Sequence, residues 1–535
     1  MNRRLGLALV LVTLGALALR VPQLDCRPMH NDEAVNALKL QGLWEKGAYR
    51  YDPHEYHGPV LHYATLPALW LSGAGDFAHV TEGTLRIVPV VFVALMVALL
   101  WLLADGLGRA GTLCAGVFTA ISPAMVFYSR YFIHEALLVC FTLLLLAAGW
   151  RYSRSRRAGW AILAGAAAGL MYATKETFVL PLAALAGAVG LTLLWQATWD
   201  QERGTESSGA RLTFLRRLAG GLPPGLCNWR HAVAAVAMAA LVSLVFFTSF
   251  FTNASGPLDS LRTYLPWLHR AGGASPHIHP WYFYLERLAW FHQGRGPVWS
   301  EALILVLAGV GLVAALRGRG LGGASVSLVR VLGFYTVLLT GAYSVISYKT
   351  PWCLLGFLHG MILLAGVGAA VVLSLPTQRW LRAVVSAGLL IAAGHLVWLA
   401  WQASYVLPAD RRNPYAYAQT SPDILELVEK VQAIARVHPQ GDQMVIKVMA
   451  REGDYWPLPW YLRQFPHAGW WDAMPQDPLA PVMIVGAGCG TGLAGKSGAS
   501  HTTAGFFSLR PSAFVELQVE SALWKRYLDA KPKED

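Results

Sequence analysis

Charged residues are scarce in this sequence, and acidic residues are the scarcer kind. Asp, Glu, Lys and Arg together make up 14% of the 535 residues, whereas soluble domains carry about 25%. Hydrophobic residues make up 55%, and the mean hydropathy is +0.42. This composition excludes an ordinary soluble globular protein and predicts a chain that lies largely within a membrane.

Cysteine is scarce as well. The six cysteines are scattered along the chain and form neither a C-x-x-C pair nor a Cys/His ligand spacing. Such spacings are what would predict a thiolate metal centre or a redox motif. We therefore expect most of the cysteines to pack within helices.

Long apolar runs take the place of charge. The first begins at Leu5, after Arg3 and Arg4, and extends to about residue 24. Ten further runs have about the 20 residues that a helix needs to cross a bilayer. The sequence therefore predicts an α-helical polytopic membrane protein with about eleven transmembrane helices, the later ten at 85–104, 112–128, 132–150, 158–174, 177–195, 232–251, 299–316, 331–347, 352–374 and 383–401.

The excess of positive charge indicates how these helices are oriented. If the N-terminus is inside, the inner segments hold 17 Arg, no Lys and 4 acidic residues, a net charge of +13. Cytoplasmic loops carry this bias in membrane proteins, so the net charge of +12 does not indicate nucleic acid as a partner. We expect a cytoplasmic (inner) membrane protein with a cytoplasmic N-terminus, whose inner segments are the N-terminus, 105–111, 151–157, 196–231, 317–330 and 375–382.

The chain divides into a transmembrane domain, residues 1–401, and a tail, residues 402–535. Two outer loops of the transmembrane domain are long, a first one at 25–84 and an interfacial one, rich in aromatic residues, at 252–298. The tail has an amphipathic helical pattern at 421–437 and strand patterns at 443–449, 481–486 and 514–520. With an odd number of spans it lies outside, which predicts a small extracytoplasmic α/β domain.

The first outer loop contains the strongest catalytic candidates. Asp32 and Glu33 are adjacent at its start, with His30, His54 and His57 in the same loop. A carboxylate at a membrane edge is costly to desolvate and is commonly functional. The alternative is that Asn31 or Asp32 caps the amphipathic segment that follows, and both roles are compatible.

Further ionisable residues lie at the predicted outer ends of helices. Any one of them could be a side chain that anchors a helix end. Together, cations and carboxylates on one side of the membrane predict a site for an anionic head group such as a lipid phosphate, with a carboxylate to take a proton from an acceptor. These residues are Arg130, His134, Glu135, Lys175, Glu176 and Lys349.

A transition-metal site is an alternative use of the histidines. The motif H-E-Y-H at 54–57 is not the metalloprotease H-E-x-x-H, because its histidines lie three residues apart instead of four. A divalent cation held by the acidic residues stays open, and so do hydrogen bonds from the histidines to sugar hydroxyls. Apart from this cation, no cofactor is predicted.

Several motifs occur in a distinctive order along almost the whole chain: HNDEAVNA, YRYDPHEYHGPVLHY, YSRYFIHEALL, ATKET, YKTPW and YWPLPWYLR. The ordered set resembles the GT-C superfamily of membrane glycosyltransferases, which includes protein O-mannosyltransferases and the aminoarabinose transferase of lipid A. Within it, the motifs look most like those of the flippase-activity-associated membrane proteins. Enzymes of this superfamily use polyprenyl-phosphate sugars as donors.

The resemblance implies a role for individual residues. Asp32 would be the catalytic acid or base, Glu33 its partner and Glu135 a second acid, at a position where relatives often carry Asp. Lys349 would face the donor phosphate, supported by Lys175 and Arg130. Residues of the same motifs would bind the sugar or the acceptor, namely His30, His54, His57, Tyr348 and Trp352.

The sequence thus predicts a hexosyltransferase. It would move a sugar from a polyprenyl phosphate to a protein, lipid or glycan acceptor at the outer face of the membrane, as in protein glycosylation or cell-envelope synthesis. The alternative is a transporter or flippase-associated subunit that handles lipid-linked sugars without catalysis. That alternative needs ionisable residues near the middle of the bilayer, whereas most of those found lie at helix ends.

Overall fold

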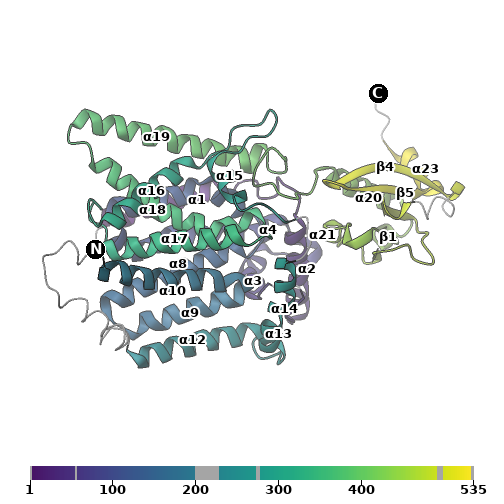
Figure 1. The fold of residues 1–535 in the computed structure, drawn as a ribbon. Helices are drawn as coiled ribbons and strands as arrows, with labels where there is room; N and C mark the ends of the chain where they lie inside the picture. Colours follow the sequence, from purple (N-terminus) through teal and green to yellow (C-terminus); the bar gives the residue numbers. More distant parts are fainter. Residues whose placement is uncertain (1–2, 55–56, 199–227, 273–276, 491–497, 532–535) are drawn as a thin grey trace, which may run out of the picture. The chain divides into compact units, whose positions relative to one another are not determined.

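The computed structural model describes residues 3–54, 57–198, 228–272, 277–490 and 498–531 (Figure 1). Most of the predicted inner segment 196–231, and four residues of the outer loop 252–298, lie outside the described residues. The chain forms two compact units. The helical unit comprises Met1–Pro22, Ala48–Thr65 and Arg86–Val406, and the mixed unit comprises Gln23–Gly47, Leu66–Leu85 and Leu407–Asp535.

The eleven apolar runs are all helical. Seven helical stretches are long and apolar enough to cross a membrane, and three shorter apolar helices accompany them in the described residues. The chain is therefore a multi-pass membrane protein, and the number of crossings stays a prediction. The helices are α1 (Arg3–Ala18), α4 (Glu82–Leu99), α6 (Arg109–Ile121), α7 (Pro123–Tyr128), α8 (Glu135–Ser155), α9 (Ala158–Thr174), α10 (Val179–Thr198), α12 (Trp229–Phe247), α16 (Ala302–Arg317), α17 (Val326–Val345), α18 (Leu355–Ser374) and α19 (Arg379–Trp401).

The run at 112–128 is not one continuous helix, in contrast to the prediction. It breaks at Ser122, whose hydroxyl accepts a hydrogen bond from the backbone of Met125, and α7 begins at Pro123. Proline has no N–H to donate and is suited to the first position of a helix. The buried carboxylate of Glu301 accepts hydrogen bonds from the Ser122 hydroxyl at 2.6 Å and from the Ala124 amide at 2.9 Å, which stabilises the break.

Small residues allow the helices of the bundle to approach closely. A Cβ atom added to Gly165 or Gly169 of α9 would lie 2.0 Å or 2.6 Å from a backbone carbonyl oxygen of α12. This four-residue spacing of glycines is typical of helix contacts in membranes. The helix α18 lies inside the bundle, since 89% of its most apolar stretch is buried. By contrast, 6% of the most apolar stretch of α12 is buried, so α12 lies at the surface of the bundle.

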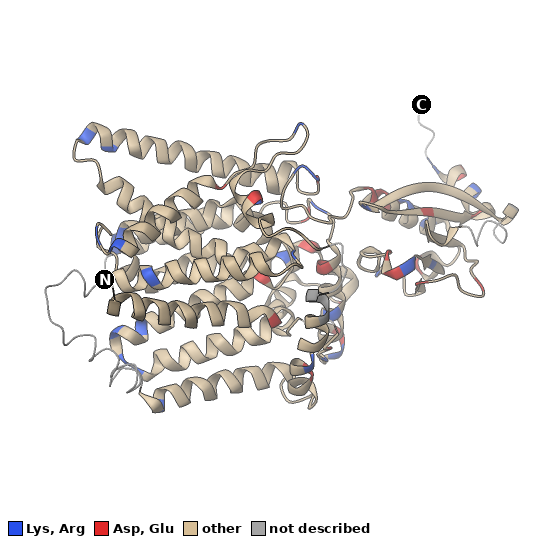
Figure 2. Ribbon diagram, viewed as in Figure 1, with Lys and Arg blue, Asp and Glu red and all other residues tan. Residues whose placement is uncertain are grey.

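Short helices connect the long ones at the end of the bundle where several acidic residues lie. In Figure 2, acidic positions of the bundle lie toward the end that carries α13 and α14. The described residues of the predicted outer loop 252–298 form three short helices, and a π-helix, η5 (Gln402–Val406), follows α19. The three are α13 (Gly256–Arg262), α14 (Tyr264–Gly272) and α15 (Phe283–Ala289).

The first outer loop contains two helices, α2 (Asn31–Lys46) and α3 (Val60–Ser72). The amphipathic segment predicted there is confirmed as α2, but its cap differs from the prediction of Asn31 or Asp32. His30 is the N-cap, its side chain accepting from the Asp32 amide, and the Glu33 carboxylate accepts from the His30 amide. This reciprocal pair is a capping box in which histidine takes the place of serine or threonine.

The tail forms the predicted α/β domain within the mixed unit. Its sheet has the strand order β2-β1-β3-β5-β4, with β1 parallel to β2 and β3, and β5 antiparallel to β3 and β4. The predicted helix and three strands are confirmed, and two strands, β2 and β4, were not predicted. The elements are α20 (Asp423–Val437), β1 (Ile446–Met449), α21 (Leu458–Tyr461), β2 (Ala468–Trp471), β3 (Val482–Gly486), β4 (His501–Arg510), β5 (Ala513–Glu520) and α23 (Ser521–Ala530).

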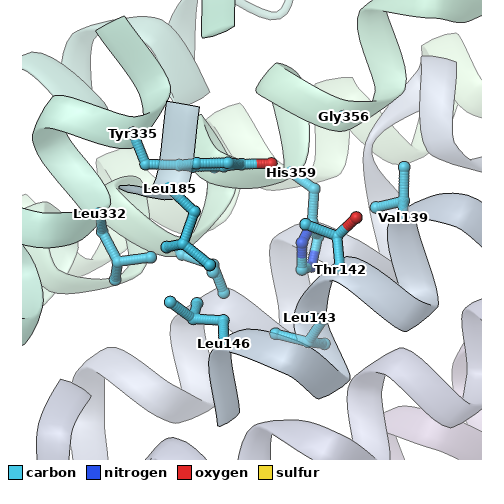
Figure 3. A pocket seen from close by; sticks show the side chains of 11 residues that line it. Val139, Thr142, Leu143, Leu146, Leu185, Leu332, Tyr335, Gly356 and His359 are labelled. Carbon is cyan, nitrogen blue, oxygen red and sulfur yellow. The ribbon is translucent and has the colours of Figure 1, made fainter. Parts of the chain in front are cut away.

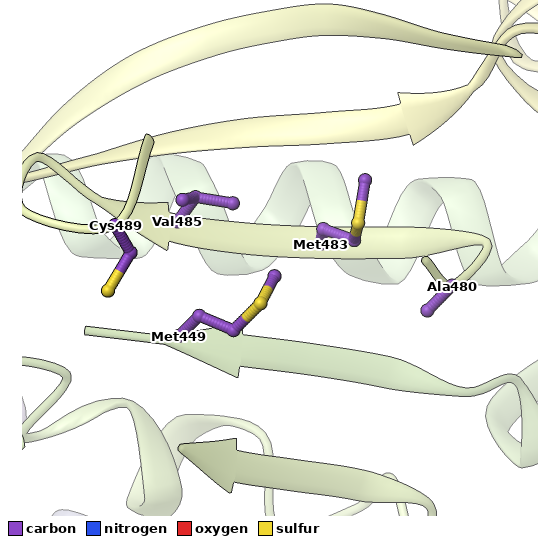
Figure 4. Close-up of a cluster of buried hydrophobic side chains, with 5 residues drawn as sticks. All are labelled: Met449, Ala480, Met483, Val485 and Cys489. Carbon is purple, nitrogen blue, oxygen red and sulfur yellow. The ribbon is translucent and has the colours of Figure 1, made fainter. Parts of the chain in front are cut away.

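One hydrophobic cluster of this domain is rich in sulfur. It consists of side chains from β1, from β3 and from the loops next to β3, and Trp471 packs against it (Figure 4). All its members are buried, and all five residues of β3 are buried as well, so β3 is covered on both faces. The members are Met449, Ala480, Met483, Val485 and Cys489.

The tail also holds those parts of the first outer loop that belong to the mixed unit, which lie within Gln23–Gly47 and Leu66–Leu85. The hydroxyl of Tyr461 accepts a hydrogen bond from the Met29 amide at 2.8 Å, and the hydroxyl of Thr420 donates to the Met29 carbonyl at 2.6 Å. On the other side, the Trp460 indole N–H donates to Glu82 at 2.8 Å. The segment that leads into α2 is therefore positioned by residues nearly 400 positions later in the sequence.

We expect Arg20→Met to destabilise the helical unit. The guanidinium of Arg20 is fully buried and donates to the carbonyls of Ala16, Thr119 and Ala120 and to the Ser129 hydroxyl, so it ties the end of α1 to α6 and α7. Its loss leaves buried acceptors unsatisfied, at about 1–3 kcal/mol each. Thermal unfolding in detergent should show a clearly lower Tm, and the exposed Arg379→Met serves as the control. Equal Tm values for the two variants would contradict this role.

Candidate functional site

Five ionisable side chains from three distant segments meet in the helical unit, and we call them the polar cluster: His57, His134, Glu135, Lys175 and Glu176. The Nδ1 of His57 lies 3.0 Å from Oε2 of Glu176, and the rings of His57 and His134 have centroids 4.8 Å apart. Lys175 donates a hydrogen bond to Glu135. Four of the five residues are buried, whereas the side chain of His57 is 29% exposed.

Backbone contacts at Gly58 join the segments of the polar cluster. The Gly58 amide donates to the Thr174 carbonyl at 3.0 Å, and the Gly58 carbonyl accepts from Nε2 of His134 at 3.2 Å. A Cβ atom at this position would lie 2.1 Å from the carbonyl oxygen of Ala173. Only glycine allows this approach, which places His57 beside the turn between α9 and α10.

Lys175 and Glu135 form a buried ion pair at two helix ends. Glu135 is the first residue of α8, where the helix dipole favours a negative charge, and Lys175 follows the last residue of α9. Burial acts to lower the pKa of Lys175, but the Glu135 carboxylate outweighs it and the pKa is raised. Lys175 is therefore charged and already has a counter-charge.

A cavity adjoins this ion pair. Besides Glu135 and Lys175, its lining includes the polar or aromatic side chains of Tyr343, Trp352 and Cys353. The structure thus brings one predicted sugar- or acceptor-binding residue, Trp352, next to the polar cluster. The cavity has about 20 Å³ of space accessible to water, enough for about one water molecule.

A second cavity continues from the first into the bundle. The two share Val139, Thr142 and Gly356, and the second extends to Tyr335 and His359 (Figure 3). The Nε2 atom of the buried His359 has no hydrogen-bond partner among the described residues. Because an imidazole nitrogen buried in this way needs a partner, this cavity is suited to hold a water molecule.

Lys349 lies in a short strand-like contact between two loops. Its amide donates to the His277 carbonyl at 2.8 Å, and Ile278 pairs with Tyr348 in an antiparallel bridge. Its Nζ donates to the carbonyls of His279, at 3.1 Å, and of Ile346. The side chain is buried, and burial lowers the pKa of Lys349. Among the described residues, its recorded hydrogen bonds are to carbonyls and none is to a carboxylate.

The loop that holds Lys349 is itself fixed by stacking. The ring of His279 stacks on the ring of Phe283, with 4.1 Å between their centroids, and the Arg287 guanidinium lies 3.5 Å from the centre of the Phe283 ring. Burial, together with the nearby charges of Arg287, His277 and Lys349, lowers the pKa of His279 to about 4. His279 is therefore neutral at pH 7 and adds no charge beside Lys349.

Arg130 is engaged with the backbone. Its Nη1 donates to the carbonyls of Arg20 at 2.6 Å and Pro22 at 2.7 Å, and to the Tyr405 hydroxyl at 2.9 Å. Its guanidinium also lies 4.4 Å from the centre of the Tyr405 ring. These contacts fix the chain after α1, and phosphate binding by Arg130 stays a prediction.

In the mixed unit, Asp32 and Glu33 have different surroundings. Glu33 is fully buried and pairs with Arg27 at 3.2 Å, in addition to its role in the capping box with His30. The side chain of Asp32, one residue earlier, is 45% exposed. His54, in the helical unit, is exposed, and its amide donates to Asp52 at 2.9 Å.

Comparisons with known proteins give a consistent result. Residues 66–209 match the family of dolichyl-phosphate-mannose-protein mannosyltransferases. The structure is similar to that of ArnT from Cupriavidus metallidurans bound to undecaprenyl phosphate, with a TM-score of 0.56 and 16% identity over 98% of this chain and 99% of that one. It is also similar to the oligosaccharyltransferase of Archaeoglobus fulgidus, with a TM-score of 0.53 and 12% identity over 87% of this chain and 63% of that one. No curated protein sequence matches the chain.

The chain has the GT-C fold. The predicted fold class is thereby confirmed, and the fold extends over almost the full length of the chain.

The GT-C fold also brings together residues that the sequence did not single out. Tyr264 donates from its hydroxyl to the Glu176 carbonyl at 3.0 Å, and Tyr343 and Cys353 line the cavity at the ion pair. Of these residues, Cys353 could have been singled out from the sequence, because it directly follows the YKTPW motif. Among the described residues of this GT-C chain, no group of three or more His, Cys, Asp or Glu side chains is arranged to hold a metal ion.

We expect the Lys175–Glu135 pair to behave as a coupled unit. Lys175→Met alone leaves a buried carboxylate without its counter-charge and should cost about 3–5 kcal/mol of stability, whereas the double variant Lys175→Met/Glu135→Leu should recover most of that loss. The measurement is thermal or denaturant unfolding of the four proteins of a double-mutant cycle. Additive effects of the two changes would show that the two side chains do not interact.

Proposed function

We propose that this chain is a glycosyltransferase that uses a polyprenyl-phosphate sugar as its donor. The observation that carries the proposal is the GT-C fold shared over 98% of the chain with ArnT, whose structure holds undecaprenyl phosphate. The match of residues 66–209 to a family of dolichyl-phosphate-mannose-protein mannosyltransferases supports the same class of donor.

The donor phosphate is best matched by Lys349. A buried ammonium that contacts carbonyl dipoles, and no carboxylate among the described residues, is stabilised by an anionic ligand. Burial lowers the pKa of Lys349, which agrees with a site that has no carboxylate partner among the described residues. A bound phosphate would supply that charge and would raise the pKa again, so binding and protonation favour each other.

Asp32 is the best candidate among the paired acids to contact an acceptor. Its carboxylate is accessible, whereas that of Glu33 is committed to Arg27 and to the N-terminus of α2. We propose that Asp32 deprotonates or orients the acceptor. Glu33 then acts as its partner by holding the helix that carries it.

The finer assignments follow from the sequence. The transferred group would be a hexose, the acceptor a protein, lipid or glycan at the outer face, and the location the cytoplasmic membrane. The excess of arginine in the inner segments supports a cytoplasmic N-terminus and an extracytoplasmic tail. A divalent cation would have to be held by fewer than three acidic or histidine side chains of the described residues.

Asp32→Asn should lower sugar transfer about 10²-fold or more, because the acceptor loses the carboxylate that orients it or takes its proton. Asp32 is not the N-cap of α2, so the substitution leaves the capping box of His30 and Glu33 intact and removes only one exposed charge from the first turn, at about 0.3–1 kcal/mol. The assay is transfer from a purified polyprenyl-phosphate sugar, with the exposed Asp25→Asn as control. Unchanged transfer by Asp32→Asn would show that Asp32 does not act in the reaction.

Lys349→Ala should lose the lipid phosphate. Native mass spectrometry of wild-type protein incubated with undecaprenyl phosphate should show a bound species that the variant lacks, because the ammonium supplies the main charge opposite the phosphate. Lys525→Ala, which removes an exposed lysine of the tail, should bind as the wild type does. Equal retention by Lys349→Ala would place the phosphate elsewhere, and binding by the wild type without any transfer would favour the transporter-subunit alternative.

A further inference from the structure

We propose that His57 and Glu176 form an acid–base dyad. In this dyad His57 accepts the proton of the acceptor group during sugar transfer, and Glu176 is the positioning residue that orients and stabilises it. The proposal rests on the proposed function and deepens it, because it assigns the acceptor proton to a named group of the helical unit instead of to the adjacent acids.

The hydrogen bond between the two side chains sets the tautomer of the imidazole. An ionised carboxylate can only accept, so at 3.0 Å from Oε2 of Glu176 the Nδ1 of a neutral His57 carries the hydrogen. Its Nε2 then carries the lone pair. When Nε2 takes up a proton, the positive charge that forms lies against the Glu176 carboxylate, which stabilises it.

The two members differ in exposure in the way that such a dyad requires. The side chain of Glu176 is 5% exposed, whereas that of His57 is 29% exposed. The carboxylate is thus shielded from water, which strengthens its effect on the imidazole. The imidazole can still be reached by another molecule.

Three further contacts fix the dyad. Gly58 anchors His57 through the Thr174 carbonyl, and the Tyr264 hydroxyl donates to the carbonyl of Glu176 itself. Before His57 in the chain, Thr263 donates to the Pro53 carbonyl at 2.9 Å. The dyad therefore has support from the short helices of the outer loop 252–298 as well as from α9, and a pair so fixed is preorganised for proton transfer.

Several charged or titratable groups surround the dyad, and any pH dependence reflects them together. The ring of His134 lies beside His57, and the charge of Lys175, which is paired with Glu135, acts on Glu176. Two tyrosine hydroxyls interact electrostatically with Glu176. Among the described residues these groups are Glu176, His134, Lys175, Glu135, Tyr51, Tyr264 and Cys353.

The reaction step balances as follows. The oxygen of an acceptor hydroxyl forms a bond to the anomeric carbon of the sugar, and the bond from that carbon to the phosphate oxygen breaks. Its electron pair leaves with the polyprenyl phosphate. The acceptor proton passes to Nε2 of His57, which later releases it to water.

The first test is chemical rescue. His57→Ala should lower the rate of transfer about 10²–10⁴-fold, and millimolar imidazole should restore part of the rate, because His57 is partly exposed and a small base can occupy the vacated space. The control is His79→Ala, which removes the histidine of an exposed His–carboxylate pair, with Asp76 at 2.6 Å. This control should keep its activity and should not respond to imidazole.

The second test is the pH dependence of kcat/KM. A neutral imidazole base predicts that the rate of the wild type falls at low pH, where the imidazole is protonated and cannot take up the acceptor proton. In His57→Gln this fall in rate should vanish. Glu176→Gln should lower kcat more than it changes KM, and Glu176→Asp should recover part of the loss, a pattern that a purely structural contact would not produce.

The outcomes separate this inference from the proposed function. If the wild type transfers sugar and His57→Ala is equally active, the dyad is overturned and the proposed function stands. The same conclusion follows if His57→Ala is folded but inactive, imidazole does not restore its activity, and the pH profile of His57→Gln is that of the wild type. If the wild type itself transfers no sugar from any polyprenyl-phosphate donor, the proposed function fails, and the dyad with it.

Discussion

The buried ion pair between Lys175 and Glu135 is the interaction on which the site depends. Each charge lies at the end of a different membrane helix, where an isolated charge would be costly to bury. Since each neutralises the other, the start of α8 and the end of α9 can meet inside the protein. The turn that follows α9 then carries Glu176 to His57, so one pairing locates both the cavity and the dyad.

The same constraint explains how the buried arginines are used. The guanidinium groups of Arg20 and Arg130 donate hydrogen bonds to backbone carbonyls at or after the ends of helices. The planar guanidinium, with its five donors, is suited to bind several carbonyls at once. These hydrogen bonds therefore fix the path of the chain after α1 and after α7. A charge at the outer end of a helix is thus not by itself a sign of chemistry, and its partners decide which role it has.

The sequence was sufficient for the helices and insufficient for the partners. Apolar runs of the right length are a property of one segment, so α8, α9 and α18 could be predicted, whereas the Ser122–Pro123 break was missed because hydrophobicity continues through it. Adjacent residues of a helix face different ways, which is why Asp32 and Glu33 have different surroundings in spite of their shared motif. The His57–Glu176 contact joins residues 119 positions apart, and nothing local to either residue predicts it.

The two lysines predicted to hold phosphate show how structure divides a role that the sequence assigns jointly. Both are buried and both lie in the segment that follows a helix, Lys175 after α9 and Lys349 after α17. Lys175 contacts a carboxylate, however, whereas Lys349 contacts carbonyls. A carboxylate has already neutralised the first, so a phosphate would have to displace Glu135 to gain the full attraction of Lys175. Carbonyl dipoles only partly compensate the second, and its lowered pKa reflects that. An incoming anion would therefore gain most at Lys349, which is why we propose Lys349 as the residue that binds the phosphate and Lys175 as one that shapes the site.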